Sequence, residues 1–149
     1  MDINSLEGKK EIIDNFSPKT KVVKNSFIAF LSGGVISMMA EILRRVLLSF
    51  GVDKTEALTL VGIFFILLAS ILTAFGVFDK IARYTGAGTL VPITGFSNAV
   101  TSQAIDSKSE GYILGVGAKI FTVAGPVILY GISSGVVYGI VYFIIQKMV

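Results

Sequence analysis

The chain of 149 residues contains no cysteine and no histidine. The absence of cysteine excludes disulfide bonds, and the absence of both residue types excludes the usual zinc sites. Without histidine the chain also lacks the commonest general base and proton shuttle of enzymes. Charge is scarce as well, at 15% of residues against about 25% in an average soluble domain. A chain with so little charge has too little polar surface to cover itself in water.

Two long segments without any charged residue indicate where the chain folds. Residues 57–78 and 120–146 contain no Asp, Glu, Lys or Arg, and hydrophobic residues make up 53% of the chain. About 20 apolar residues in a helix are enough to cross the hydrocarbon core of a bilayer. We therefore expect an all-α integral membrane protein, a helical bundle of about four to five transmembrane or re-entrant helices.

The distribution of charge divides the chain into a polar tail and one membrane-embedded domain. Residues 1–26 are polar and of mixed charge, whereas 27–149 hold the apolar segments, the first two of which are expected at 27–50 and 57–78. The tail either forms a short amphipathic helix that ends before Pro18 or is solvated. Because lysines are frequent before the first span, we expect the N-terminus on the cytoplasmic side. These are Lys9, Lys10, Lys19, Lys21 and Lys24.

Three charged residues interrupt the first expected span. Glu41, Arg44 and Arg45 are spaced i, i+3 and i+4, so in a helix they share one face and can pair. They either mark a charged helix end at the membrane surface, with the arginine side chains reaching the headgroups, or form an ion pair in the protein interior.

The segment 84–105 is uncharged and long enough to span a bilayer, but it is poorly suited to a helix that faces lipid. It is rich in Gly, Thr and Ser and is interrupted by Pro92. Irregular backbone at membrane depth persists only where it is buried in protein or lines a hydrated cavity. We expect residues 86–91 to be non-helical and a helix to follow over 92–105, with Pro92 in its first position.

The helix after Pro92 would have an uncharged polar face. Its polar side chains recur at helical spacing and belong to Thr94, Ser97, Asn98, Thr101 and Ser102. These groups either hydrogen-bond to neighbouring helices or line a hydrated path for a solute, and the Gly-rich break before them favours the second reading. The residues that we expect on this path are Gly86, Gly88, Pro92, Thr94, Asn98 and Thr101.

A polar turn at 106–111 precedes a last apolar segment that is too long for one plain span. We expect its main span at 121–142, with a kink at Pro126 and with Lys119 at a membrane edge or in a cavity. In this span Gly131, Gly135 and Gly139 repeat every fourth residue, a spacing that lets a second helix approach closely. We expect this glycine face to pack against another helix, of the same subunit or of an oligomer partner.

Enzymatic activity and nucleic-acid binding both fit the sequence poorly. There is no Ser/His or Cys/His pair, the acids nearest membrane depth each have a basic neighbour, and the glycine motifs of dinucleotide and phosphate sites are absent. We therefore expect no enzyme, no cofactor and no metal site. The net charge of +3 indicates topology or contact with membrane lipid rather than a nucleic-acid partner.

The run from Gly86 to Asn98 resembles the signature of the stage V sporulation protein AC/AE membrane family. Three further pieces agree in order and spacing: Ala29 and Phe30 followed by Gly33 and Gly34, the run from Thr73 to Lys80, and Ser109 to Gly111. The resemblance extends from about Pro18 to Lys147, nearly the whole chain. A long string of Gly, Pro and Asn is far more specific than hydropathy alone.

The resemblance implies a location and a transported solute. It implies the inner membrane of the forespore and spore, and a complex that moves dipicolinic acid with calcium during sporulation and germination. It also implies an AE-b-type membrane subunit and an AD-type soluble subunit as partners. Two roles remain open for this chain, a channel subunit for dipicolinate and a non-conducting scaffold or gating subunit. No residue role follows from the resemblance.

Overall fold

The computed structural model describes residues 21–148, and every regular element among them is helical. The tail helix considered from the sequence lies in residues outside this range. The elements are, in order, α2 (Val22–Ser49), α3 (Lys54–Ala74), α4 (Phe78–Thr85), α5 (Ala87–Leu90), α6 (Ile93–Asp106), the short 3₁₀ turn η1 (Lys108–Glu110), the π-helical turn η2 (Tyr112–Gly117) and α7 (Ala118–Met148). The expected all-α membrane architecture is confirmed.

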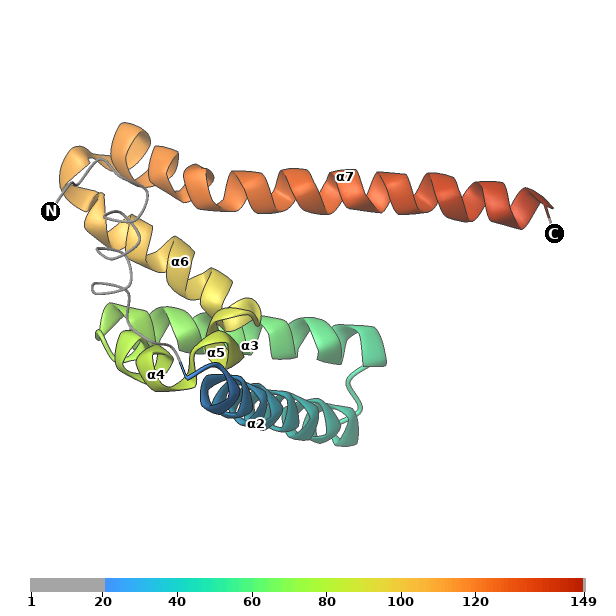
Figure 1. Ribbon diagram of the computed structural model, residues 1–149, viewed down its shortest axis with the longest axis horizontal. Helices are drawn as coiled ribbons and strands as arrows, with labels where there is room; N and C mark the ends of the chain where they lie inside the picture. Colours follow the sequence, from blue (N-terminus) through green and yellow to red (C-terminus); the bar gives the residue numbers. More distant parts are fainter. Residues whose placement is uncertain (1–20, 149) are drawn as a thin grey trace, which may run out of the picture.

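Helices α2 and α3 form an antiparallel hairpin (Figure 1). The first span begins five residues earlier than predicted, at Val22, so its first turn lies in the segment assigned to the tail. Gly51 follows α2 in the left-handed region at φ +82°, which reverses the chain. The Asp53 carboxylate then accepts a hydrogen bond from the Thr55 backbone N–H at 2.9 Å and caps α3. This backbone donor holds the pKa of Asp53 below its ordinary value.

The second span begins and ends earlier than predicted, because α3 runs over Lys54–Ala74 and not over 57–78. Gly76, with φ +64°, breaks the helix, and a separate helix α4 begins at Phe78. Helix α4 was not predicted from the sequence. This short helix buries Phe78 and has three charged residues, Asp79, Lys80 and Arg83.

Residues 86–91 are less irregular than predicted. Gly86 breaks the backbone at φ +54°, but the next four residues form the helical turn α5. The prediction of a wholly non-helical segment was therefore wrong. Pro92 immediately precedes α6 as its N-cap, in an extended conformation, so the second break is at Pro92 itself. Proline has no backbone N–H to complete a continuous helix across this point.

The pair α5–α6 forms a re-entrant hairpin. Side chains of α6 bond to the second half of α3, from the Ile66 carbonyl to Thr73. Figure 1 shows α6 running in the same general direction as α3, at an angle to it, and returning to the end of the bundle at which α3 ends and α4 begins. At 14 residues, α6 is about 21 Å long and too short to cross a bilayer alone.

The break before Pro92 lies near mid-depth of the bundle. Ser97, in the second turn of α6, bonds to the carbonyl of Ile66 in the middle of α3. Thr89 and Thr94, on either side of the break, line a cavity that extends from Ile36 in the middle of α2 to Ile81 of α4. The hairpin thus enters the bundle to about half the length of the spanning helices and then turns back.

The last segment begins at the same end of the bundle and runs to the other end (Figure 1). Its first turn is the π-helix η2, and α7 continues without interruption from Ala118 to Met148, with Pro126 inside it. The helix thus continues through Pro126, and the kink expected there stays a prediction. Three segments of the described chain are long and apolar enough to cross a membrane: Val22–Ser49, Lys54–Ala74 and Tyr112–Lys147.

Candidate functional site

The polar face predicted on α6 meets hydroxyl groups of α3. Ser97 Oγ donates to the Ile66 carbonyl oxygen at 2.8 Å, and Ser70 Oγ lies 2.9 Å from Ser97 Oγ. Thr101 Oγ1 donates to Ser70 Oγ at 3.1 Å. A carbonyl can only accept, and each hydroxyl has one proton. The direction is therefore fixed from Thr101 through Ser70 and Ser97 to Ile66. We call this chain of four groups the hydroxyl seam.

Asn98 extends the contact between α3 and α6 by one further pair. Thr73 Oγ1 lies 2.8 Å from Asn98 Oδ1 and 2.7 Å from the carbonyl oxygen of Ala69, so the two acceptors share one hydroxyl proton. Within the described part of the chain, no buried side-chain nitrogen or oxygen lacks a hydrogen-bond partner. The buried polar atoms of this interface are thus paired within the chain.

Glycine permits the close approach of α5 to α2. A Cβ atom on Gly88 would collide with Ser32 Oγ and the Ala29 carbonyl, whereas a Cβ atom on Gly33 would lie 3.6 Å from the Gly88 carbonyl oxygen, an ordinary van der Waals distance. Ser32 Oγ also approaches the Thr85 carbonyl oxygen at 3.4 Å. Gly88 is therefore a packing position on the α2 side of the hairpin.

The turn between α5 and α6 is closed from within the hairpin. Thr94 Oγ1 donates to the Thr89 carbonyl oxygen at 2.8 Å, across the break at Pro92. A Cβ atom on Gly95 would collide with the Leu90 carbonyl, so glycine is needed for this tight approach. Beside the turn is an apolar cavity of about 250 Å³, bounded by α2, α3 and α4.

The structure thus brings together most of the residues predicted for a solute path. Thr94 closes the hairpin turn, Asn98 and Thr101 face α3, and Gly88 contacts α2. Gly86 provides the first break and Pro92 the second. Sequence reasoning missed Ser70 and Thr73, the α3 half of the interface. Their signal was present as two hydroxyl residues one turn apart in an otherwise apolar span.

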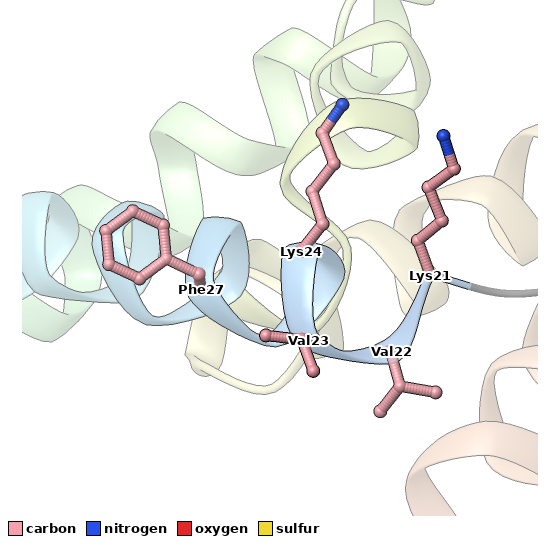
Figure 2. A pocket seen from close by; sticks show the side chains of 5 residues that line it. All are labelled: Lys21, Val22, Val23, Lys24 and Phe27. Atoms are coloured by element: carbon pink, nitrogen blue, oxygen red, sulfur yellow. The ribbon is translucent and has the colours of Figure 1, made fainter.

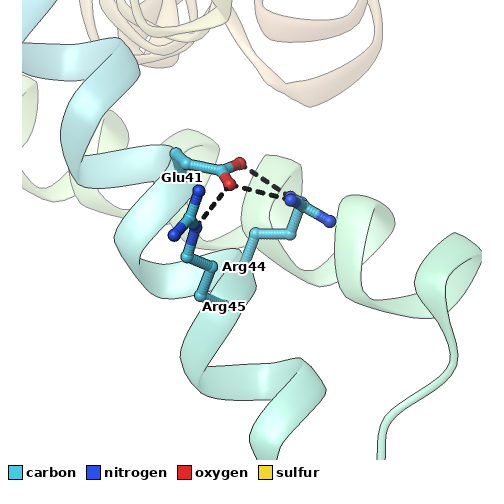
Figure 3. A network of polar contacts seen from close by, with 3 residues as sticks. All are labelled: Glu41, Arg44 and Arg45. Atoms are coloured by element: carbon cyan, nitrogen blue, oxygen red, sulfur yellow. Dashed lines mark hydrogen bonds and ion pairs between the residues drawn. The ribbon is translucent and has the colours of Figure 1, made fainter.

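Three of the charged residues of α2, Glu41, Arg44 and Arg45, form a compact triad (Figure 3). Arg44 binds the Glu41 carboxylate through two nitrogens, at 2.7 and 2.8 Å, and Arg45 binds it through Nε at 2.8 Å. The Arg44 side chain is 24% exposed and that of Arg45 is 76% exposed. Counted along the chain, Arg44 lies as far before the end of α2 as Thr59 lies after the start of α3. Both residues are therefore near the end of the hairpin that the 50–53 loop closes. The triad therefore lies near one end of the hairpin, as expected for charges close to a membrane surface.

Comparison with known families matches residues 25–141 to the SpoVAC/SpoVAEB sporulation membrane proteins. The chain belongs to this family. The stage V sporulation protein AC of Bacillus subtilis (strain 168) is 35% identical over 146 residues, which cover 97% of each chain. No solved structure matches the chain. The match to the SpoVAC/SpoVAEB family begins in the first turn of α2 and includes the whole re-entrant hairpin.

Within this SpoVAC/SpoVAEB chain, the glycine face of α7 has no intramolecular partner among the described residues. A Cβ atom added to Gly131, Gly135 or Gly139 would meet nothing within 4 Å. Helix α7 contacts α6 and η2 near its start, and its remaining length stands apart from α2 and α3 (Figure 1). Near its end, Tyr138 stacks on Tyr142, and Lys147 lies over the Phe143 ring, a grouping suited to a membrane interface.

The described residues offer no cluster for a metal ion. No group of three or more Asp or Glu side chains lies close enough together there to hold one. The chemistry of the site is therefore that of neutral hydroxyl, amide and backbone groups in the interior of a sporulation membrane protein.

Proposed function

We propose that this chain is a subunit of a membrane channel that moves dipicolinic acid, with calcium, across the inner membrane of the spore. The solute would enter the core during sporulation and leave it during germination. The observation that supports this most strongly is the re-entrant hairpin α5–α6, whose break lies near mid-depth. Interrupted helices at membrane depth are typical of solute paths, because their polar backbone needs protein or water around it.

The hydroxyl seam would serve as a closed contact in this channel. In the single chain, Ser97, Asn98 and Thr101 pair with α3. If α3 and α6 part, the same neutral groups would face the solute. Hydroxyl and amide groups can solvate a calcium–dipicolinate complex without trapping it by charge, so release would remain easy.

The chain would act together with other subunits. The unpartnered glycine face of α7 suits a helix from another membrane subunit, for which an AE-b-type protein is the candidate, with an AD-type soluble subunit bound at the surface. The surrounding lipid would cover the remaining apolar surface. We assign no enzymatic activity, cofactor or nucleic-acid partner to the chain.

The topology would place the N-terminus on the cytoplasmic side, which in a spore is the core. The re-entrant arrangement puts Lys80, Arg83 and Lys108 at the end of the bundle where α2 begins, together with Lys21 and Lys24. The other end has four basic residues, Arg44, Arg45, Lys54 and Lys147. The larger number of basic residues at the first end favours a cytoplasmic position for that end.

A second role, a non-conducting scaffold or gating subunit, is favoured by the complete pairing of the seam. A reversible cross-link distinguishes the two roles. The chain has no native cysteine, and Ser70 and Ser97 have their Oγ atoms 2.9 Å apart, so the Ser70→Cys/Ser97→Cys pair is close enough to form a disulfide. Oxidation would lock α3 to α6, and reduction would release them.

The experiment measures dipicolinate efflux from liposomes that contain the chain with its membrane partner. A channel role predicts that oxidation of the double variant stops efflux and that reduction restores it, whereas each single variant conducts in both conditions. Efflux that is unchanged by a complete cross-link contradicts a path through the seam and supports the scaffold role. Normal dipicolinate content in spores that lack the chain contradicts both roles.

A further inference from the structure

A second polar recess lies outside the hydroxyl seam, at the end of the bundle where the hairpin begins. It has a volume of about 290 Å³ and is bounded by the first turns of α2 and by the junction of α4 with α5. Its polar side chains come from both sides: Asn25 and Ser26 from α2, and Arg83 and Thr85 from α4. We call it the corner pocket.

The charge of the corner pocket is positive. Arg83 is its one charged lining residue, and among the described residues no acidic side chain lines it. Asp79 lies one turn before Arg83 and shares a neighbouring recess with it, but no ion pair joins the two. The Arg83 guanidinium is therefore available to an anion that enters from solution.

Two lysines of the adjacent turn of α2 line a separate recess near the corner pocket. Lys24 precedes Asn25 in the chain, and Lys21 lies one turn earlier. Figure 2 shows the ammonium groups of Lys21 and Lys24 pointing to the same side of α2, whereas Val22 points away from them. A basic pocket with an amide and hydroxyl groups offers several hydrogen-bond donors to carboxylate or phosphate oxygens.

The position of the pocket connects it to the hairpin. Gly86 lines the pocket and is also the first break of the re-entrant segment, and Ser32, one turn after Ala29 of the pocket wall, contacts the Thr85 carbonyl. An anion held here would sit at the entrance of the segment that extends to mid-depth.

We propose that the corner pocket binds a small dicarboxylate anion, with Arg83 as its principal contact, and concentrates it at the mouth of the hairpin. This assignment rests on the proposed transport of dipicolinate. The planar guanidinium can bind one carboxylate through two parallel hydrogen bonds. Asn25 and Ser26 lie on the opposite wall and would contact the second carboxylate. The phosphate of an anionic lipid offers the same chemistry, so the test separates the two sources.

The test measures binding of dipicolinate to the full-length protein in nanodiscs of zwitterionic lipid. We expect Arg83→Gln to weaken binding about ten-fold or more, because it removes a charge-assisted contact. Arg83→Lys retains the charge without the planar fork and should bind with intermediate affinity. The matched control is Lys80→Gln on the same helix, since Lys80 does not line the pocket and its loss should leave the affinity unchanged. Thermal unfolding of each variant confirms that it is folded.

Equal affinity of wild type and Arg83→Gln would overturn the proposal, as would absence of dipicolinate binding to the wild type. A second arm uses nanodiscs with anionic lipid and no dipicolinate. The proposal would also be overturned if anionic lipid co-purifies only when Arg83 is present and dipicolinate does not displace it. That result would assign the corner pocket to lipid headgroups. The dipicolinate content of spores from a strain without the chain tests the transport function separately. Failure of the proposed binding site and failure of the proposed transport function are therefore distinguishable.

Discussion

The Ser70 hydroxyl lies 2.9 Å from the Ser97 hydroxyl, and this contact joins a spanning helix to the returning arm of a re-entrant hairpin. Ser70 is the central member of the seam, since it accepts from Thr101 and donates to Ser97. Both residues are small, so the helices approach closely where the hydroxyls meet.

The central position of Ser70 leads to a stability prediction. Ser70→Ala leaves Thr101 without an acceptor and Ser97 without a donor, so it should destabilise the fold by about 1 kcal/mol, within the range known for hydrogen bonds between membrane helices. Ser102→Ala is the control, because the Ser102 hydroxyl bonds only to the Ala99 carbonyl of its own helix. Thermal unfolding in detergent measures both. A larger loss for Ser102→Ala than for Ser70→Ala would contradict the seam.

A second prediction concerns the contact between α5 and α2. Gly88→Ala should destabilise the protein by about 1–3 kcal/mol, because the new methyl group meets Ser32 and the Ala29 carbonyl without free space. Gly34→Ala is the matched control on α2, where a Cβ atom meets nothing within 4 Å and alanine improves helix propensity. Thermal stability and the amount of protein in the membrane report the difference. Equal behaviour of the two variants would mean that α5 does not pack on α2 as described.

How far the sequence predicted this structure depends on the element. The uncharged segments predicted the spans, since length and lack of charge determine whether a helix enters a bilayer. The positions of the helix breaks at residues 75–77 and 91–92 were predicted less accurately. Gly76 and Pro92 disrupt a helix, but they do not indicate which neighbouring residues remain helical. Thr94, Asn98 and Thr101 were recognised as one polar face. Their partners on α3 could not be assigned, because spacing within one helix does not specify its neighbour.

The third prediction uses the cap of α3 and depends on pH. The folded state lowers the pKa of Asp53, so ionised Asp53 stabilises the fold above the ordinary aspartate pKa, and this contribution is lost as the pH falls through the lowered value. Asp53→Ala should lower the melting temperature at pH 7, and its difference from the wild type should shrink below about pH 4. Asp53→Asn, which can also cap a helix, should lose less. A pH-independent difference for Asp53→Ala would exclude the charged cap.

The glycine face of α7 gives a fourth prediction. Gly135→Leu should leave the stability of the isolated chain unchanged, because a Cβ atom at Gly135 meets nothing within 4 Å among the described residues, but should impair co-purification with the proposed membrane partner. Val136→Leu is the control, since Val136 is exposed and lies on a neighbouring position of the same helix. Normal co-purification and normal dipicolinate loading with Gly135→Leu would show that this face is not an assembly surface.

The re-entrant course of residues 78–111 is the central structural claim, and cysteine accessibility tests it most directly because the chain has no native cysteine. Single variants Ser26→Cys, Lys80→Cys, Ser109→Cys and Lys54→Cys are treated in sealed vesicles with a membrane-impermeant thiol reagent. The re-entrant hairpin predicts that positions 26, 80 and 109 are labelled from one side of the membrane and position 54 from the other. Labelling of positions 80 and 109 from opposite sides would mean that the segment between them crosses the bilayer, and would contradict the hairpin.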